Sequence, residues 1–294
     1  MSILVVANAE AGSAERHRVE AGWAVLADRQ GTELRWTEEP EELDEVLDDL
    51  GCRTLVVAGG DGSLHLVAQR LWDRGILEET LLGLVPLGTG NDLARGLGLP
   101  LEPQEAARVL LDGKPRSLDL LVDEEGSIAV NAVHAGLGAE AAVRSEDLKG
   151  SLGPLAYPIG AAIAGVRAGG WDLEVTLDGQ RLLPADPGEG VLMVGVANGP
   201  SIGGGTLLIP HAALDDGLLD VLVVAATGAA ARAAFGAALR RGEHLPRRDV
   251  AHGRGGEVRI AGDRVRYDVD GEVIEEVAER TYRLVPRAWR MLAA

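Results

Sequence analysis

The stretch Val56-Val57-Ala58-Gly59-Gly60-Asp61-Gly62-Ser63 places three glycines and one carboxylate where an apolar strand is expected to turn into a helix. The strand is indicated by apolar, partly β-branched residues up to Ala58, and the helix by apolar residues at helical spacing from Leu64 to Leu71. Glycine lets a ligand approach the backbone closely, and a helix N-terminus attracts phosphate through its N–H groups and dipole. Ser63 is placed to cap the helix. The stretch is therefore a candidate phosphate-binding turn.

Two interpretations of these glycines are open. They form either a tight strand-to-helix turn without chemistry or a cradle for phosphate, and the glycines alone favour neither. Asp61 favours the cradle, because a bare carboxylate repels phosphate unless it organises Mg²⁺ or removes a proton.

The first 120 residues alternate short apolar runs with amphipathic segments. This alternation predicts an α/β domain with a parallel sheet and helices on both faces, and ligands bind such sheets at the carboxyl ends of the strands. The expected strands are 3–7, 33–36, 54–58 and 81–86, and the expected helices are 14–30, 40–50, 64–74 and 103–111.

After Leu118 the pattern changes to period-two strands, which predicts a β-rich, mostly antiparallel second domain over residues 121–285. Asp178-Gly179 lies between two such strands and predicts a hairpin with a type I′ turn. The closing segment 286–292 has helical spacing and is expected to pack back on the first domain, which then comprises residues 1–120 and 286–294. The other expected elements are strands at 128–134, 190–197, 219–224, 257–261 and 264–269, and helices at 157–167 and 229–241.

Charge and composition exclude several classes of protein. The 28 basic and 46 acidic residues give a net charge of −18, which argues against nucleic-acid binding and against permanent adhesion to anionic membranes. No apolar run reaches about 18 residues, and strand-like residues come directly after the first methionine, so a cytoplasmic, unprocessed chain is expected. The single cysteine, Cys52, is expected to be an ordinary buried thiol.

A second glycine-rich element, Pro86-Leu87-Gly88-Thr89-Gly90-Asn91-Asp92-Leu93-Ala94-Arg95, follows the next strand. Its glycines free the backbone, Thr89 offers a hydroxyl to phosphate, and Asn91 or Asp92 is expected to cap the following helix. Taken alone, this element favours an ordinary helix N-terminus with a capping pair, but two glycine-rich turns at neighbouring strand ends favour a shared binding crevice. A third segment, Asn8 to Ser13, occupies the same position after the first strand. Neither the Gly-x-x-x-x-Gly-Lys-Ser/Thr nor the Gly-x-Gly-x-x-Gly signature occurs, so nucleotide binding would need another solution.

These elements resemble the motifs of the diacylglycerol kinase and sphingosine kinase family, including its soluble bacterial lipid kinases. The resemblance rests on residues 59–63 and 86–95, on Asn198 to Asp220 with its Asp215-Asp216-Gly217, and on Val269-Asp270-Gly271-Glu272. It runs from residue 3 to about residue 290 in the same order. It implies a Rossmann-like ATP-binding domain of the NAD kinase and diacylglycerol kinase type, a sandwich-like second domain, and a cleft between them.

The resemblance also implies roles for individual residues. Asp216 would bind a structural Mg²⁺, or Ca²⁺, together with the carbonyl groups of Ala213 and Leu218. Glu272, with Asp270 beside it, would take the proton of the acceptor hydroxyl, and Asp61 is the other candidate for the base. Asp270-Gly271 could also be only a second hairpin turn. The candidate ATP-binding residues are Asn8, Gly12, Ser13, Thr37, Gly59, Gly60, Asp61, Gly62, Ser63, Gly88, Thr89, Gly90, Asn91 and Asp92.

The implied activity is transfer of phosphate from ATP to a lipid hydroxyl at a membrane surface, with diacylglycerol as the first choice and phosphatidylglycerol or a sphingoid base next. Membrane contact would be peripheral and transient, and a homodimer is left open. Arg240, Arg241, Arg247 and Arg248, with His244 between them, are the candidate basic face for that contact, or simply solvated arginines. Arg16 and Arg18 would meet the phosphates or lie on a solvated helix face.

Two other functions stay open. NAD kinases share the Gly-Gly-Asp-Gly element, so a kinase of a soluble acceptor such as NAD is one alternative. A non-catalytic nucleotide or lipid sensor on the same scaffold is the other. The sequence also departs from the family pattern at Ala9, Ser63 and His65, where Pro, Thr and Asn are usual.

Overall fold

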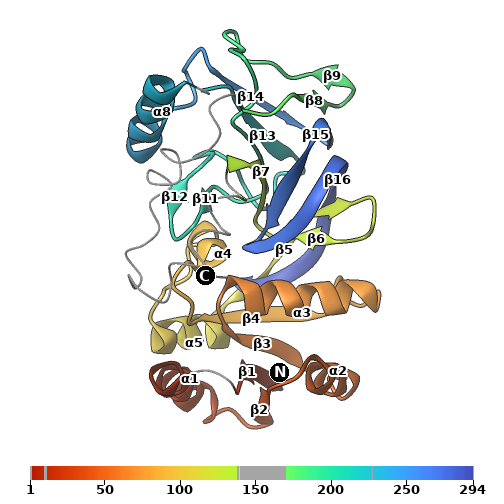
Figure 1. Ribbon diagram of the computed structural model, residues 1–294. Coiled ribbons are helices and arrows are strands. Elements are labelled where there is room, and N and C mark those ends of the chain that lie inside the picture. The colour runs from red at the N-terminus through yellow and green to blue at the C-terminus, as the bar shows by residue number, and fades with distance from the viewer. Residues whose placement is uncertain (1, 10–11, 138, 140–169, 227, 294) are drawn as a thin grey trace. The chain divides into compact units, whose positions relative to one another are not determined.

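The computed structural model describes residues 2–9, 12–137, 139, 170–226 and 228–293 (Figure 1). The chain divides into two compact units, the first formed by Met1–Leu120 and Pro286–Ala294, the second by Leu121–Val285. The helix expected at 157–167 lies outside the described residues.

Unit 1 has the predicted α/β architecture. Its strands pair in the order β2-β1-β3-β4, all parallel, and the end of β16 (Glu272–Ala293) pairs in parallel with β4. The elements are β1 (Ile3–Asn8), α1 (Ser13–Leu26), β2 (Thr32–Thr37), α2 (Pro40–Asp48), β3 (Thr54–Gly59), α3 (Asp61–Asp73), β4 (Leu81–Pro86), α4 (Asp92–Gly96) and α5 (Pro103–Asp112).

Both faces of the parallel sheet are covered by helices (Figure 1). Successive strand residues point to opposite faces, so every second residue of β1 and β3 enters the same core. One face packs against α1 and α5, and the other carries Val6 and Val57 towards α2 and α3. The core between the sheet and α1 and α5 includes Ile3, Val5, Ala7, Val19, Leu26, Val56, Ala58, Val85, Ala107 and Leu110.

The closing segment is a strand, so the prediction of a helix at 286–292 is wrong. Arg290 and Met291 pair with Leu81 and Leu82 of β4, and Trp289 is fully buried with its indole N–H bonded to the Asp119 carbonyl at 3.0 Å. A short apolar run is compatible with the period of a helix and with that of a strand. The edge of β4 favours the strand, because its backbone N–H and C=O groups need hydrogen-bond partners.

Cys52 also differs from expectation. It is exposed, because it lies in the turn between α2 and β3 rather than in the strand itself.

Unit 2 is β-rich and mostly antiparallel, as predicted. Its main sheet has the order β14-β13-β10-β7-β15-β16, with β8 and β9 attached at β15 and β5 and β6 at β16, while β11 and β12 pair separately. Strand β5 (Lys114–Asp123) begins in unit 1 and ends in unit 2. The other elements of unit 2 are β6 (Ile128–Ala129), β7 (Ala132–Gly136), β8 (Leu173–Leu177), β9 (Gln180–Arg181), β10 (Met193–Ala197), β11 (Ser201–Ile202), β12 (Thr206–Leu207), β13 (Leu219–Val224), α8 (Ala229–Arg241), β14 (Val250–Gly255) and β15 (Glu257–Val269).

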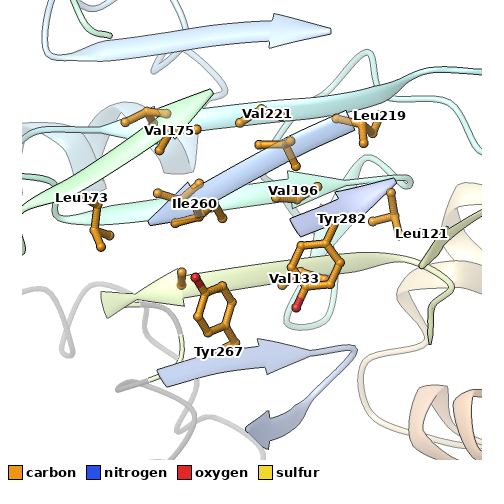
Figure 2. Packing of buried hydrophobic residues seen from close by; sticks show 14 of the residues in the cluster. Leu121, Val133, Leu173, Val175, Val196, Leu219, Val221, Ile260, Tyr267 and Tyr282 are labelled. Atoms are coloured by element: carbon orange, nitrogen blue, oxygen red, sulfur yellow. The ribbon is translucent and has the colours of Figure 1, made fainter. Parts of the chain in front are cut away.

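The central strands β7, β10 and β13 of unit 2 are buried on both faces. Phe235 and Leu239 of α8 pack on one face. The other face carries the cluster shown in Figure 2, which includes Val196, Val221 and Ile260 and the rings of Tyr267 and Tyr282, whose centroids are 6.4 Å apart. Burial raises the pKa of both phenols, so they stay neutral.

The candidate basic face between α8 and β14 is not a row of free cations. Arg241 forms an ion pair with Glu243, and Arg247 forms one with Asp249. His244 is fully buried and its Nε2 lies 2.6 Å from the Leu208 carbonyl oxygen. His244 therefore cannot belong to a surface for membranes. No helix in the described part of the chain is long and apolar enough to cross a bilayer.

His244 should make the stability of unit 2 depend on pH. Burial lowers the pKa of His244 below its usual 6.5. At a pH between the two pKa values, His244 is therefore protonated in the unfolded chain and neutral in the folded chain. This contribution to stability is complete above about pH 6.5 and is lost as the pH falls through the lower folded-state pKa. We expect His244→Gln, which keeps an N–H for Leu208 but cannot titrate, to flatten the pH dependence of Tm between about pH 7 and about pH 5. An unchanged slope in thermal melts would contradict this assignment.

Candidate functional site

The two glycine-rich turns of unit 1 are packed directly against each other. A Cβ atom added to Gly88 would lie 2.8 Å from the Cα of Gly60, and one added to Gly60 would lie 3.1 Å from the Cα of Gly88. The Leu87 N–H donates to the Gly59 carbonyl at 2.9 Å. The turns therefore meet backbone to backbone at the carboxyl ends of β3 and β4, and neither contact residue can carry a side chain without a shift.

Asp61 joins the same two turns through its carboxylate. Oδ2 accepts the Asp92 N–H at 3.2 Å, and Oδ1 accepts the Leu93 N–H at 3.3 Å. These are N–H groups of the first turn of α4, which have no partner within the helix. The carboxylate thus caps a helix 31 residues further along the chain, where negative charge also interacts favourably with the helix dipole.

The residues predicted as helix caps make no capping hydrogen bond with their side chains. Asn91 precedes α4 in the left-handed conformation, with φ of 52°, and its Nδ2 donates to the Gly88 carbonyl at 2.7 Å. Helix α3 begins at Asp61 after Gly60, so Ser63 is its third residue and its side chain makes no cap hydrogen bond. Ser63 and Asp92 lie inside helices, so the prediction that they are caps is wrong. Asn91 does occupy the N-cap position of α4, but its side chain makes no capping hydrogen bond, and the Asp61 carboxylate accepts the first N–H groups of α4 instead.

A pocket of about 110 Å³ lies at the ends of β1, β2 and β3. It brings together Asn8, Thr37 and Ser63, three of the predicted ATP-binding residues. Asn8 and Thr37 are direct strand partners, and the Ala9 N–H donates to the Thr37 carbonyl at 2.9 Å. The opposite wall is apolar and comes from α2 and α3, with Leu43, Leu66 and Val67.

Arg16 and Arg18 brace the backbone around these turns. Arg18 donates through Nη1 to the Leu87 carbonyl at 2.5 Å and through Nη2 to the Pro86 carbonyl at 3.2 Å. Arg16 donates to the Ala9 carbonyl and lies 5.2 Å from the centre of the Trp36 ring. Sequence reasoning missed this bracing role, since nothing local to α1 shows a contact 69 residues away.

In unit 2, Asp270-Gly271 is a two-residue hairpin turn, the alternative that the sequence left open. Both residues have positive φ, 51° and 98°, and Val269 pairs with Glu272. The Asp270 carboxylate accepts three backbone N–H groups, from Val130 at 2.7 Å, Asn131 at 3.0 Å and Ala132 at 2.9 Å.

The predicted hairpin at Asp178-Gly179 has the same construction. Its residues have φ of 48° and 75°, and the Asp178 carboxylate accepts the N–H groups of Gly256 and Glu257. In both turns an aspartate in the left-handed conformation anchors a neighbouring segment. The Asp270 carboxylate is therefore engaged as a structural acceptor.

Glu272 contrasts with Asp270. It is exposed at the start of β16, and its carboxylate makes no hydrogen bond or ion pair with any described residue. Of the two carboxylates in the late motif, only that of Asp270 is held by hydrogen bonds to backbone N–H groups of described residues.

Two buried asparagines that the sequence did not single out support the segment held by Asp270. Asn198 donates to the Val130 carbonyl at 2.9 Å, and Asn131 donates to the Ser201 carbonyl at 2.9 Å. A Cβ on Gly199 would lie 2.1 Å from Asn131 Oδ1, so glycine is required there. No local pattern marks these residues, because their partners are 68 and 70 residues away.

The candidate metal ligand Asp216 already has a cation beside it. Its Oδ1 accepts the Leu218 N–H at 3.1 Å, and its Oδ2 is ion-paired with the guanidinium of Arg254. A metal ion at this carboxylate would compete with that guanidinium for the same oxygen. As arranged, the Asp216 carboxylate that was predicted to bind the ion with the carbonyl groups of Ala213 and Leu218 does not fit a bound Mg²⁺ or Ca²⁺.

Two family comparisons cover nearly all of the chain. The diacylglycerol kinase catalytic domain matches residues 2–122, and the YegS C-terminal NAD kinase beta sandwich-like domain matches residues 131–293. A protein of Stenotrophomonas maltophilia (strain K279a) named "Probable lipid kinase YegS-like" is 33% identical over 302 residues, which cover 98% of this chain and 94% of that protein. This chain belongs to the YegS-like lipid kinase family. The family recognition made from the sequence is thereby confirmed.

Further relatives agree with this YegS-like assignment. A "Probable lipid kinase YegS-like" of Pseudomonas aeruginosa PAO1 is 39% identical over 231 residues, covering 76% of this chain and 71% of that protein. A crystal structure of a putative diacylglycerol kinase from Bacillus anthracis str. Sterne superposes with a TM-score of 0.79 at 21% identity, covering 100% of this chain and 97% of that one. The superposition confirms the predicted fold class.

The contact between the two turns can be tested with a pair of alanine substitutions. We expect Gly88→Ala to lower the free energy of unfolding by about 1–3 kcal/mol, because the new methyl group meets the backbone of Gly60. Gly62→Ala is the matched control, since a Cβ at Gly62 meets nothing within 4 Å. Denaturant titration of both variants measures the difference, and equal stability would show that the turns can separate without cost.

Proposed function

We propose that this YegS-like protein transfers the γ-phosphate of ATP to the hydroxyl group of a lipid. The observation that carries the proposal is the close-packed pair of glycine turns at the carboxyl ends of β3 and β4, within a domain of the diacylglycerol kinase catalytic type. Glycine turns of this kind expose backbone N–H groups to phosphate oxygens, and phosphoryl transfer depends mainly on positioning and charge neutralisation.

The pocket beside these turns supports ATP as the phosphate donor. Its apolar wall suits a flat base, and Asn8, Thr37 and Ser63 supply polar groups to fix the orientation of the base and sugar. The N-terminus of α3 borders the same pocket through Ser63, and its dipole favours the negative phosphates. Thr89 and Gly90 lie in the second turn, after β4, and would contact the phosphates of ATP from that side.

A divalent ion is expected to accompany ATP, and Mg²⁺ suits phosphate and carboxylate oxygens. Asp61 is the candidate for this role, because its carboxylate lies where the two glycine turns meet and accepts the first N–H groups of α4. When bound, Mg²⁺ would neutralise charge on the transferred phosphate.

Glu272 is the proposed base. Its carboxylate is exposed and has no hydrogen-bond or ion-pair partner among the described residues, so it could accept the proton of the acceptor hydroxyl, whereas the Asp270 carboxylate binds the backbone of residues 130–132. Asp270 would then position the β15–β16 hairpin that carries Glu272. The proposed acceptor is diacylglycerol, with phosphatidylglycerol or a sphingoid base as the next choices, reached by peripheral contact with a membrane from the cytoplasm.

One observation favours a second candidate, a nucleotide or lipid sensor without catalysis. Asp61 and Asp270, two of the three candidate catalytic carboxylates, both accept backbone N–H groups and would be retained for structure alone. A sensor would bind ATP but transfer no phosphate.

A labelled-phosphate assay decides between these functions. The protein, with Mg²⁺ and γ-labelled ATP, is offered vesicles that contain diacylglycerol, phosphatidylglycerol or sphingosine, and in a separate reaction soluble NAD. We expect label in one lipid product and none in NAD. Label in NAD alone would replace the lipid by a soluble acceptor, and ATP binding without any transfer would favour the sensor.

The different roles proposed for Glu272 and Asp270 can be tested by substituting each residue. We expect Glu272→Gln to lower the rate about 10²–10⁴-fold with an unchanged Tm, because the side chain is exposed and a general base is lost. Asp270→Asn should lower Tm, because a charged acceptor of three N–H groups is weakened.

Asp178→Asn is the control for that pair of variants. It weakens the same kind of turn outside the late motif, so Tm should fall while the rate per folded molecule stays the same. Full activity in Glu272→Gln would assign the base to another residue.

A further inference from the structure

Three potential metal ligands meet in unit 2, outside the residues assigned to phosphoryl transfer. His211 follows the β11–β12 hairpin, Asp220 lies on β13 and His252 lies on β14. In the β13–β14 register, Asp220 is opposite Arg254 and Leu222 is opposite His252, so Asp220 and His252 are diagonal neighbours on one face of the sheet. Three elements thus contribute one side chain each.

The three ligand atoms form a compact triangle. His252 Nε2 is 2.9 Å from Asp220 Oδ1, His211 Nε2 is 3.4 Å from the same oxygen, and the two Nε2 atoms are 3.2 Å apart. An ion about 2.0–2.2 Å from each donor, in tetrahedral or octahedral geometry, requires donor separations of about 2.9–3.5 Å. The spacing already present matches one shared metal ion.

Asp220 gives an independent indication of a missing ligand. Its side chain is 1% exposed, and its Oδ2 is buried and has no hydrogen-bond partner among the described residues. Leaving a buried carboxylate oxygen without a partner is costly, whereas a cation bound to the carboxylate would satisfy it.

Hydrogen bonding alone accounts poorly for the cluster. Both imidazoles and the Nε of Arg254, at 3.3 Å, approach the single oxygen Oδ1, while no donor in the described part of the chain reaches Oδ2. Arg254 is shared with Asp216, so its charge is not dedicated to Asp220. A divalent ion would use both imidazole lone pairs and the carboxylate together.

We propose that His211, Asp220 and His252 bind a late first-row divalent cation, Zn²⁺ by preference. Two imidazole nitrogens and one carboxylate oxygen suit Zn²⁺, Co²⁺ or Ni²⁺ and disfavour Mg²⁺ and Ca²⁺, which take oxygen ligands. The His211 side chain is 46% exposed, which leaves a path for the ion and a coordination position for water. The site shares no ligand with Asp216, Ala213 and Leu218 and does not depend on the proposed kinase activity.

The bound ion ties the segment after β12 to strands β13 and β14. That segment carries Leu208, the partner of the buried His244, so a cation there also supports the packing around α8. Because the ligands come together only in the folded chain, the ion stabilises unit 2 by mass action.

The test uses the full-length metal-free protein titrated with Zn²⁺ by calorimetry and with Co²⁺ by visible absorption, in the presence of excess Mg²⁺. We expect one Zn²⁺ per chain that Mg²⁺ does not displace, a Tm that rises with Zn²⁺, and a Co²⁺ spectrum of nitrogen and oxygen ligation. Loss of an outer-shell partner lowers metal affinity about 10–100-fold, so His211→Ala and His252→Ala should each cost at least about 100-fold. His17→Ala, which removes an exposed histidine of α1, is the matched control and should bind as the unmodified chain does.

Two outcomes would overturn the proposal. In one, the unmodified protein binds neither Zn²⁺ nor Co²⁺, and the three side chains are then a hydrogen-bonded cluster only. In the other, both histidine variants bind as tightly as the unmodified protein, which places the ion elsewhere. His211 lies in an exposed loop position, so His211→Ala should fold, and its Tm without metal verifies this.

Discussion

The backbone contact between Gly60 and Gly88 is the constraint on which the candidate nucleotide site depends. It sets the separation of two turns that follow adjacent parallel strands, and it lets the Asp61 carboxylate reach the first N–H groups of α4. Without the two glycines the turns would stand further apart, and the positions of α4 and of the pocket wall beside β3 would change. The geometry of this edge of the sheet therefore requires residues without side chains at Gly60 and Gly88.

Unit 2 uses carboxylates in a related way. Asp178 and Asp270 each occupy the left-handed position of a hairpin turn and accept N–H groups from a segment far along the chain. Together with Asp61, they show that an aspartate in a motif can be required for geometry before it is required for catalysis. Glu272 differs from them because its carboxylate accepts no hydrogen bond from any described residue. The arrangement separates the groups that build the site from the group proposed to act in it.

Much of this fold follows from local pattern, and the exceptions share a cause. Alternating strands and helices predicted unit 1, and the Asp-Gly dipeptide predicted the turn at residue 178, because periodicity and turn chemistry are local. The closing segment was mistaken for a helix since seven residues fit both periods and only the edge of β4 decides. The motifs marked Asp61 and Asp270, but not the contacts they make with residues 31 to 140 positions away. The His211, Asp220 and His252 cluster escaped for the same reason.

The path of the chain has a consequence for the order in which the protein is made. Unit 2 is contiguous, whereas the sheet of unit 1 is completed only when residues 286–293 add their strand to β4. Trp289 and Leu292 belong to the interior of unit 1, so during synthesis the nucleotide-binding half emerges first yet waits for the end of β16 before its core can close. A chain truncated after residue 285 would keep a complete β-rich unit attached to an α/β unit with an open sheet edge and an incomplete core, a species that is prone to aggregate.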